Sequence, residues 1–316
     1  MAEALFIGLD LGGTEVKVGL GGADGALIWR DRAPSHAREG GEAILEALGA
    51  AAGAAIAEAA RRGGEVRALG LGTPGIVDRA NGRIRYPVAN LGGWHGTDLA
   101  GYFRARFGFP AVIENDANSA AWGEYRRGAG QGAQTLVMAT VGTGIGGGAV
   151  IEGTLLRGAS GAAMELGHTL FRAGGRACPC GLAGCLEAYS GGRAMAEEWA
   201  QRRGADPTRS PDAAPSPSDL LRAEREGDPI AAEILDAGAR ALGHGLVSAL
   251  HLLNPDVLII GGGILEARPR HRELAIEGVR AHVLPKAIDG LSIRPAACGN
   301  EAGIIGALLL ATEVAS

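Results

Sequence analysis

The segment LFIGLDLGGTEVKVGLGG, residues 5–22, decides the fold. Two apolar stretches, 5–11 and 15–22, flank a Gly-Gly-Thr turn, and this pattern predicts two strands joined by a tight hairpin. Residues 26–32 predict a third strand, an Ala- and Glu-rich stretch at about 41–62 predicts a helix, and residues 66–74 predict a return to a strand. Strands that alternate with helices in this way are typical of an α/β protein.

A second segment repeats this pattern. Residues 135–151, TLVMATVGTGIGGGAVI, again read as strand, Gly/Thr turn and strand, which suggests an internal duplication of a β-β-α unit. Between the two copies, residues 111–115 predict a buried strand that runs directly into a helix at 116–127. Further on, Ser216-Pro217-Ser218-Asp219 predicts a helix start, residues 229–253 predict a long helix, and residues 256–264 predict a strand opening into three glycines.

Composition excludes several classes of protein. The 316 residues suffice for two domains, and 47% hydrophobic with 21% charged residues is typical of a globular protein. The net charge is −5 and no basic stripe is present, so we expect no nucleic-acid partner. The start lacks the charged region of a signal peptide, and no apolar run approaches the roughly 18–20 residues that span a bilayer. We therefore expect a cytoplasmic protein, with reduced thiols and no membrane partner.

Glycine-rich turns follow three of the predicted strands. The first strand ends at Asp10, before Gly12-Gly13-Thr14; residues 141–148 form a second such turn, and residues 258–263 a third opening. Backbone amides in such a turn suit phosphate oxygens, and the Asp10 carboxylate suits Mg²⁺. The alternative is a plain hairpin in which Asp10 only satisfies turn amides. Neither Gly/Thr turn has the spacing of a Walker A loop or a Rossmann fingerprint.

The dipeptide Asn115-Asp116 lies where a buried strand ends and a helix begins. A side chain at that place reaches the carboxyl edge of the sheet, where α/β proteins bind ligands. Phosphoryl transfer to a hydroxyl needs one carboxylate to receive the hydroxyl proton, and Asp116 suits that role. The alternative is that Asp116 is simply the N-cap of the helix.

Three of the four cysteines, Cys178, Cys180 and Cys185, lie within eight residues of one another. A tetrahedral Zn²⁺ site needs a fourth ligand, and His168 is the nearest histidine, whereas Cys298 is a more distant alternative. A disulfide is disfavoured by the reducing compartment, and a redox pair by the absence of C-x-x-C. The cluster therefore predicts a structural zinc site.

Taken in order, these segments resemble the ROK family of sugar kinases and related repressors, within the hexokinase–actin superfamily. The resemblance covers nearly the whole chain. It rests on LDLGGT (9–14), GLGTPGIVD (70–78), ENDANSAAWGE (114–124), TVGTGIGGGAV (140–150), ELGH (165–168), CPCGLAGCLE (178–187), LIIGGGI (258–264) and NEAGIIGA (300–307).

The resemblance implies an α/β, two-domain ribonuclease H-like/actin-like ATPase fold with an interdomain cleft. The N-terminal domain would comprise residues 1–116, joined by the C-terminal helix at about 300–316, and the larger domain residues 117–299. It implies a kinase that phosphorylates the 6-hydroxyl of a hexose, most simply glucose, with ATP and Mg²⁺, and that forms a homodimer or a dimer of dimers.

The resemblance also assigns roles to residues. Asp116 would be the catalytic base. The sugar would be held by Asn115, Asp116, Glu165, His168 and Glu187, with Gly75 and Asn90 at its edge. The phosphates and the metal would be surrounded by Asp10, Gly12, Gly13, Thr14, Thr143 and Gly144, and the nucleotide approached by Gly261, Gly262 and Gly263. Zinc would be bound by His168, Cys178, Cys180 and Cys185.

Two positions depart from the family pattern. Glu15 stands where the family usually carries Lys, although Lys17 follows, and Met164 replaces the customary Gly before Glu165. The alternatives are a kinase for N-acetylmannosamine, fructose, mannose or allose, polyphosphate as the donor, a sugar-sensing repressor, or a catalytically silent protein. A repressor would carry a helix-turn-helix domain of about 80 residues before the first strand, and retention of Asp10 and Asp116 argues against a silent protein.

Overall fold

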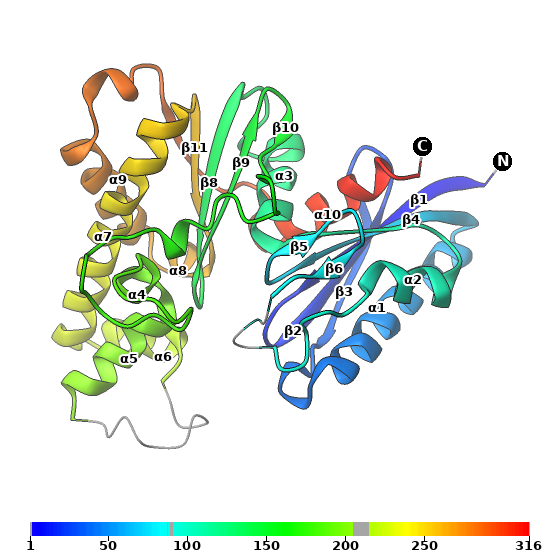
Figure 1. Cartoon of the computed structure of the whole chain (residues 1–316), viewed down its shortest axis with the longest axis horizontal. Coiled ribbons are helices and arrows are strands. Elements are labelled where there is room, and N and C mark those ends of the chain that lie inside the picture. The colour runs from blue at the N-terminus through cyan, green and yellow to red at the C-terminus, as the bar shows by residue number, and fades with distance from the viewer. Residues whose placement is uncertain (1, 87, 89–90, 205–214, 316) are drawn as a thin grey trace. The chain divides into compact units, whose positions relative to one another are not determined.

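The computed structural model describes residues 2–86, 88, 91–204 and 215–315, and Figure 1 shows their helices and strands. The chain divides into two compact units. Unit 1 comprises Met1–Gly132, Gly148–Met164 and Ala297–Ser316, and unit 2 comprises Ala133–Gly147 and Glu165–Ala296. The domain boundaries implied by the resemblance, 1–116 with about 300–316 and 117–299, stay a prediction.

The first sheet has five strands in the order β3-β2-β1-β4-β7. These strands are β1 (Glu3–Leu11), β2 (Glu15–Gly21), β3 (Leu27–Pro34), β4 (Gly64–Thr73) and β7 (Ala111–Asn115). Strands β1 to β3 form an antiparallel meander, whereas β1, β4 and β7 are parallel. The register aligns Asp10 with Gly72 and Gly72 with Glu114, so the carboxyl ends of the three parallel strands meet at one edge.

The two faces of this sheet are covered by different helices. Helix α1 (Gly41–Arg61) packs on the face formed by alternate residues of β1, and the buried side chains there include Leu5, Ile7, Leu9, Leu11, Ile44 and Leu48. The C-terminal helix α10 (Ala302–Thr312) packs against β1 and β4. Its backbone approaches so closely that a Cβ at Gly70 would collide with the carbonyl of Ala307. Only glycine therefore fits at position 70.

The second sheet has the strand order β10-β9-β8-β11-β12. Its strands are β8 (Thr135–Val141), β9 (Ile145–Ile151), β10 (Thr154–Leu155), β11 (Val257–Gly261) and β12 (Ser292–Pro295). Strands β8, β11 and β12 are parallel, and β9 and β10 are antiparallel. The order matches that of the first sheet, in which a hairpin is followed outward by later parallel strands. This match is the repeat that the two Gly/Thr turns predicted.

The remaining elements surround these sheets. They are η1 (Ala37–Glu39), β5 (Val77–Asp78), β6 (Arg83–Ile84), α2 (Leu99–Phe107), α3 (Asp116–Arg127), η2 (Leu166–His168), α4 (Glu187–Ser190), α5 (Gly192–Arg202), α6 (Pro217–Arg225), α7 (Pro229–Leu253), α8 (Gly263–Ala267), α9 (Pro269–His282), η4 (Pro285–Ala287) and η5 (Gly299–Glu301). Helices α3 and α7 have the bounds that the sequence predicted. Helix α6 begins with the predicted Ser216 cap, closed by Asp219 in a capping box.

Helix α1 departs from one expectation. It has 21 residues, and an 18-residue stretch of it has a mean hydropathy of 1.5, so by length and composition it could cross a membrane, contrary to the prediction that no segment is apolar enough. Its apolar face is nevertheless used inside unit 1, where Ile44, Leu48, Ala52 and Ala55 are fully buried. The core helix of a globular unit can have the same length and hydropathy as a membrane-spanning helix. The alternation of buried and exposed residues along α1 fits a core helix.

Candidate active site

The first set of predicted site residues lies at the carboxyl edge of the first sheet, in unit 1. Asp10 is the penultimate residue of β1, Asn115 is the last residue of β7, and Asp116 follows it. Strands β1 and β7 are separated only by β4, so these residues lie about 10 Å apart along one edge. The carboxyl edge of parallel strands is where open α/β sheets bind ligands.

The helix after β7 is capped by Asn115 rather than by Asp116. The Oδ1 atom of Asn115 accepts hydrogen bonds from the backbone N–H groups of Ala117 at 2.9 Å and Asn118 at 3.1 Å. Asp116 is the first residue of α3, is half-buried, and accepts a hydrogen bond from the N–H of Ala117 at 2.9 Å. The alternative that Asp116 serves as the N-cap is therefore wrong, because its neighbour already fills that role.

Asn115 also brings a second predicted sugar residue into place. Its Nδ2 atom donates to the carbonyl oxygen of Gly75 at 3.2 Å. Gly75 has a φ of +102°, in the region that favours glycine, and a Cβ there would lie 2.6 Å from the side chain of Val88. The structure therefore places Gly75 and Asn115 together. Asn90, the other residue predicted at the sugar's edge, lies outside the described residues.

The turn after Asp10 is a hairpin with exposed backbone. The N–H of Gly12 closes the turn on the carbonyl of Glu15 at 2.8 Å, while Gly13 and Thr14 are exposed. No backbone hydrogen bond within the described part of the chain uses the N–H of Gly13 or Thr14. Two backbone donors and a hydroxyl thus remain for a ligand, as the phosphate-binding interpretation requires.

The Asp10 carboxylate sits beside this turn next to a cation. The Nζ atom of Lys17 lies 3.6 Å from Oδ2 of Asp10, on the adjacent strand. Burial raises the pKa of Asp10, the Lys17 charge opposes that rise, and Glu15 adds to it. Lys17 thus places a positive charge at the Asp10 carboxylate, while Glu15 points toward Arg32 at 4.0 Å.

The second set of predicted site residues lies in unit 2, around the turn between β8 and β9. The Oε2 atom of Glu187 accepts a hydrogen bond from the N–H of Ile145 at 2.9 Å. A Cβ at Gly144 would lie 3.1 Å from Cδ of Glu187 and still closer to Oε2. Glycine at 144 therefore leaves the space that the Glu187 carboxylate fills, and the hydrogen bond from Ile145 to Glu187 joins residues 42 positions apart in the chain.

The same turn is held by its neighbours in unit 2. The carbonyl of Thr143 accepts a hydrogen bond from the N–H of Arg193, at the start of α5, at 2.9 Å. The glycines after β11 approach it from the adjacent strand: Gly262 has a φ of +104°, and a Cβ there would lie 2.5 Å from the carbonyl oxygen of Val141. Of the predicted nucleotide glycines, Gly262 therefore lies against Val141, the residue before the 142–144 turn.

The Glu165–His168 segment begins at a strained residue. Met164 has a φ of +65°, which lies in the left-handed region that residues other than glycine rarely adopt. Glu165 precedes the 3₁₀ turn η2, and desolvation raises its pKa, with His168 opposing the rise and Glu187 adding to it. The customary glycine would adopt this backbone freely, so the Met164 departure costs strain of about 1 kcal/mol.

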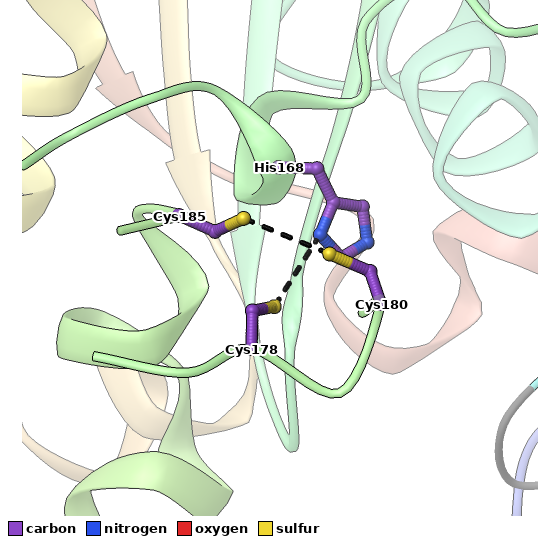
Figure 2. A group of neighbouring side chains, drawn as sticks. All are labelled: His168, Cys178, Cys180 and Cys185. Atoms are coloured by element: carbon purple, nitrogen blue, oxygen red, sulfur yellow. Dashed lines mark hydrogen bonds between the residues drawn. The ribbon is translucent and has the colours of Figure 1, made fainter. Parts of the chain in front are cut away.

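Four metal-ligating side chains converge beside η2. Figure 2 shows His168, Cys178, Cys180 and Cys185 pointing toward one another, and their ligand atoms all lie within 4.8 Å of one another. The Sγ atom of Cys178 is 3.8 Å from Nδ1 of His168, and the Sγ atoms of Cys180 and Cys185 are 3.6 Å apart. The other proposed ligand, Cys298, belongs to unit 1, where its Sγ lies 3.8 Å from the carbonyl of Gly123.

This donor set fits a tetrahedral zinc ion. Bonds of about 2.3 Å to sulfur and 2.0 Å to nitrogen separate the ligand atoms by about 3.5–3.8 Å, which agrees with the Cys178–His168 and Cys180–Cys185 distances. Burial raises the pKa of the Cys178 thiol to about 12 and also raises that of Cys185, so thiolates at these positions need the charge of a cation. With Nδ1 of His168 facing the sulfurs, its Nε2 is available to a second partner.

A sequence profile of the ROK family matches residues 6–314. The chain belongs to the ROK family. The glucokinase of Streptomyces coelicolor is 35% identical to it over 324 aligned residues, covering 98% of each chain. Two solved structures share its fold. The ROK hexokinase from Thermus thermophilus is 38% identical with a TM-score of 0.81 and covers 97% of each chain. A ROK family glucokinase from Streptomyces griseus, in complex with glucose and AMPPNP, is 33% identical with a TM-score of 0.84, covering 98% of this chain and 99% of that one.

These similarities confirm the α/β fold of actin-like ATPases that the sequence predicted for this ROK chain.

One feature beside the site was not singled out from the sequence. Glu114 is a carboxylate in the buried strand AVIEN, directly before Asn115, and it is 4% exposed. A charged residue in an otherwise apolar strand is the signal that would have identified it.

Proposed function

We propose that this ROK protein is an ATP-dependent glucokinase that transfers the γ-phosphoryl group of ATP to the 6-hydroxyl of glucose. One observation carries the proposal: Asp116 stands at the carboxyl end of β7, on the same sheet edge as the Asp10 turn. In a chain that aligns over nearly its full length with glucokinases, this arrangement provides a carboxylate base beside a phosphate-binding turn.

Asp116 acts as the general base in this proposal. It accepts the proton of the 6-hydroxyl as the hydroxyl oxygen attacks the γ-phosphorus, and a base positioned in this way contributes about 10²–10⁴-fold. The N–H of Ala117 fixes the orientation of its carboxylate. Because Asn115 caps α3, the Asp116 side chain is not needed to start the helix.

The sugar is held by hydrogen bonds from charged and amide side chains. In the proposal these side chains are those of Asn115, Asp116, Glu165, His168 and Glu187, with Gly75 and Asn90 at the sugar's edge. Carboxylates and amides pair with adjacent hydroxyl groups, and a group left unpaired by the wrong epimer costs several kcal/mol, so such a set selects one sugar. Glu187 suits this role because the Ile145 N–H and the space over Gly144 fix its carboxylate.

The nucleotide is bound by the glycine turns. In the proposal the phosphates contact the turn residues Asp10, Gly12, Gly13, Thr14, Thr143 and Gly144, and the remainder of ATP approaches Gly261, Gly262 and Gly263. The half-buried Asp10 carboxylate is a hard oxygen ligand suited to Mg²⁺ or to its bound water, and this ion neutralises phosphate charge when bound.

The Cys₃His cluster would hold a structural Zn²⁺. Four protein ligands leave no open position for water, so the ion would fix the loop rather than take part in the reaction. The loop runs from Cys185 through Leu186 into Glu187, so fixing it also fixes two of the proposed sugar ligands, His168 and Glu187. We further propose a cytoplasmic protein that forms a homodimer or a dimer of dimers.

A coupled assay of ADP release tests the proposal. Purified protein is supplied with ATP and Mg²⁺ and with glucose, mannose, fructose, allose or N-acetylmannosamine in turn. We expect the highest kcat/KM for glucose. The absence of ADP release with every sugar would refute the kinase function, and a higher kcat/KM with another sugar would refute glucose as the preferred acceptor.

A further inference from the structure

The buried carboxylate of Glu114 gathers three hydrogen-bond donors. Its Oε2 atom accepts from Nε of Arg157 at 2.6 Å, and its Oε1 atom accepts from Nδ2 of Asn118 at 3.1 Å and from the N–H of Asn115 at 3.0 Å. The side chain of Glu114 is 5% exposed and that of Arg157 21%. A carboxylate buried to this degree needs such partners, and Arg157 supplies the only charge among these three.

Arg157 belongs to a different part of unit 1, two residues after the end of the short strand β10. Its carbonyl accepts a hydrogen bond from the N–H of Ala163 at 3.1 Å, which closes residues 157–163 into a loop. Within this loop, Gly161 has a φ of +83°, and a Cβ there would lie 2.5 Å from the carbonyl oxygen of Val77. The loop therefore rests on the segment that follows Gly75.

The 157–163 loop thus contacts two segments that carry proposed sugar residues. Through Arg157 it is attached to β7, which ends in Asn115, and through Gly161 it lies against the Gly75–Asp78 segment. Along the chain the loop leads into Met164 and then Glu165, a third proposed sugar residue. Neither Glu114 nor Arg157 has a part in the phosphoryl transfer proposed above.

We infer that Arg157 is a positioning residue for sugar binding, because its ion pair with Glu114 fastens the 157–163 loop to the strand that presents Asn115 and Asp116. The inference rests on the proposed function. The guanidinium suits the task because it keeps its charge and directs Nε at a carboxylate in a fixed plane, which a lysine cannot reproduce. Releasing the loop would loosen the Gly75 segment and the approach to Glu165 together.

The test compares Arg157→Met with a matched control, Arg268→Met. Arg268 also forms buried ion pairs, with Glu224 of α6 and Asp236 of α7, but in unit 2, where neither helix carries a proposed sugar residue. Both variants should lower the Tm. Only Arg157→Met should lower kcat/KM for glucose, by about 10- to 100-fold and mainly through KM, because a displacement of about 1 Å at a binding group costs about that much. The KM for ATP should stay within about twofold, and Arg157→Lys should recover part of the loss.

Glucose affinity measured calorimetrically without ATP separates this inference from the proposed function. Wild-type protein that binds glucose but releases no ADP would refute the kinase function, and the comparison of glucose Kd between wild type and Arg157→Met would still decide the inference. If Arg157→Met does not fold, Glu114→Gln provides the same comparison, with an expected rise in Kd of at least about fivefold. A glucose KM and Kd within twofold of wild type, together with a Tm loss like that of Arg268→Met, would overturn the inference, and so would a wild type that binds no hexose.

Discussion

The substitution Gly144→Ala should damage glucose phosphorylation by displacing a single carboxylate. The φ of Gly144 is not in the left-handed region, so alanine fits the backbone and only the added methyl group acts. That methyl group would lie 3.1 Å from Cδ of Glu187 and closer to Oε2 than the 3.0 Å below which real Cβ contacts are essentially never found. The carboxylate must therefore move.

The size of the effect follows from that displacement. To reach an ordinary van der Waals distance the carboxylate moves by about 1 Å, which stretches or breaks its 2.9 Å hydrogen bond with the N–H of Ile145. A hydrogen bond to a charged group contributes about 1.5–3 kcal/mol. Misplacing a substrate-binding group by about 1 Å costs about 10²-fold, which corresponds to about 2.7 kcal/mol of transition-state stabilisation.

Steady-state ADP release measures this effect. Glucose is varied at saturating ATP, and the expected result for Gly144→Ala is a fall of about 10²-fold in kcat/KM for glucose. Gly53→Ala is the control, because a Cβ at Gly53 in α1 meets open space. That variant should keep its kinetic constants within about twofold and gain about 0.5–1 kcal/mol of stability, since glycine is unfavourable inside a helix. A value of kcat/KM for Gly144→Ala within threefold of wild type would refute the assignment of Glu187 as a sugar ligand held over Gly144.

Two further predictions concern the metal cluster and a buried histidine in unit 2. Metal analysis should find about one zinc per chain, and Cys180→Ser should lower both the zinc content and the Tm, since a structural zinc contributes on the order of 10 kcal/mol to ordering its loop; zinc near zero in folded wild-type protein would contradict the site. Burial lowers the pKa of His271 from 6.5 to about 4, with the Arg268 charge adding to the fall and Asp236 opposing it. Between pH 6.5 and 4, His271 is therefore protonated in the unfolded chain but neutral in the folded chain. The free energy of unfolding should consequently fall by about 3 kcal/mol as the pH drops from 6.5 to 4. Urea unfolding of His271→Leu should show a smaller fall over that range, and an equal fall in both proteins would contradict the prediction.

The parts of the fold with strong local patterns were predictable from the sequence. The β7–α3 junction and helix α7 have the expected bounds because alternating or helical apolar patterns end there at an Asn or at Asn254-Pro255. Helices α2 and α9 were not singled out. Both are rich in arginine, and α2 has only nine residues, so each depends on packing against a neighbour, β7 for α2 and α7 for α9, rather than on its own pattern.

The residue types of the site were predictable, but their mutual contacts were not. The Gly/Thr turns, the Asn-Asp pair and the cysteine cluster each occur within a few residues, so local spacing identifies them. The hydrogen bond from Ile145 to Glu187 joins residues 42 apart, and the pair Arg157–Glu114 joins residues 43 apart. Such contacts are made by the tertiary fold, and no local pattern encodes them.

The assignment of Asp116 as the catalytic base is tested most directly by Asp116→Asn. The asparagine has the same shape and can still accept the hydrogen bond from the N–H of Ala117, but it cannot take up the proton of the sugar hydroxyl. Single-turnover and steady-state ADP release with glucose should show kcat lowered by about 10²–10⁴-fold. The calorimetric Kd for glucose should stay within about threefold of wild type. A variant that retains kcat within tenfold of wild type would contradict the account.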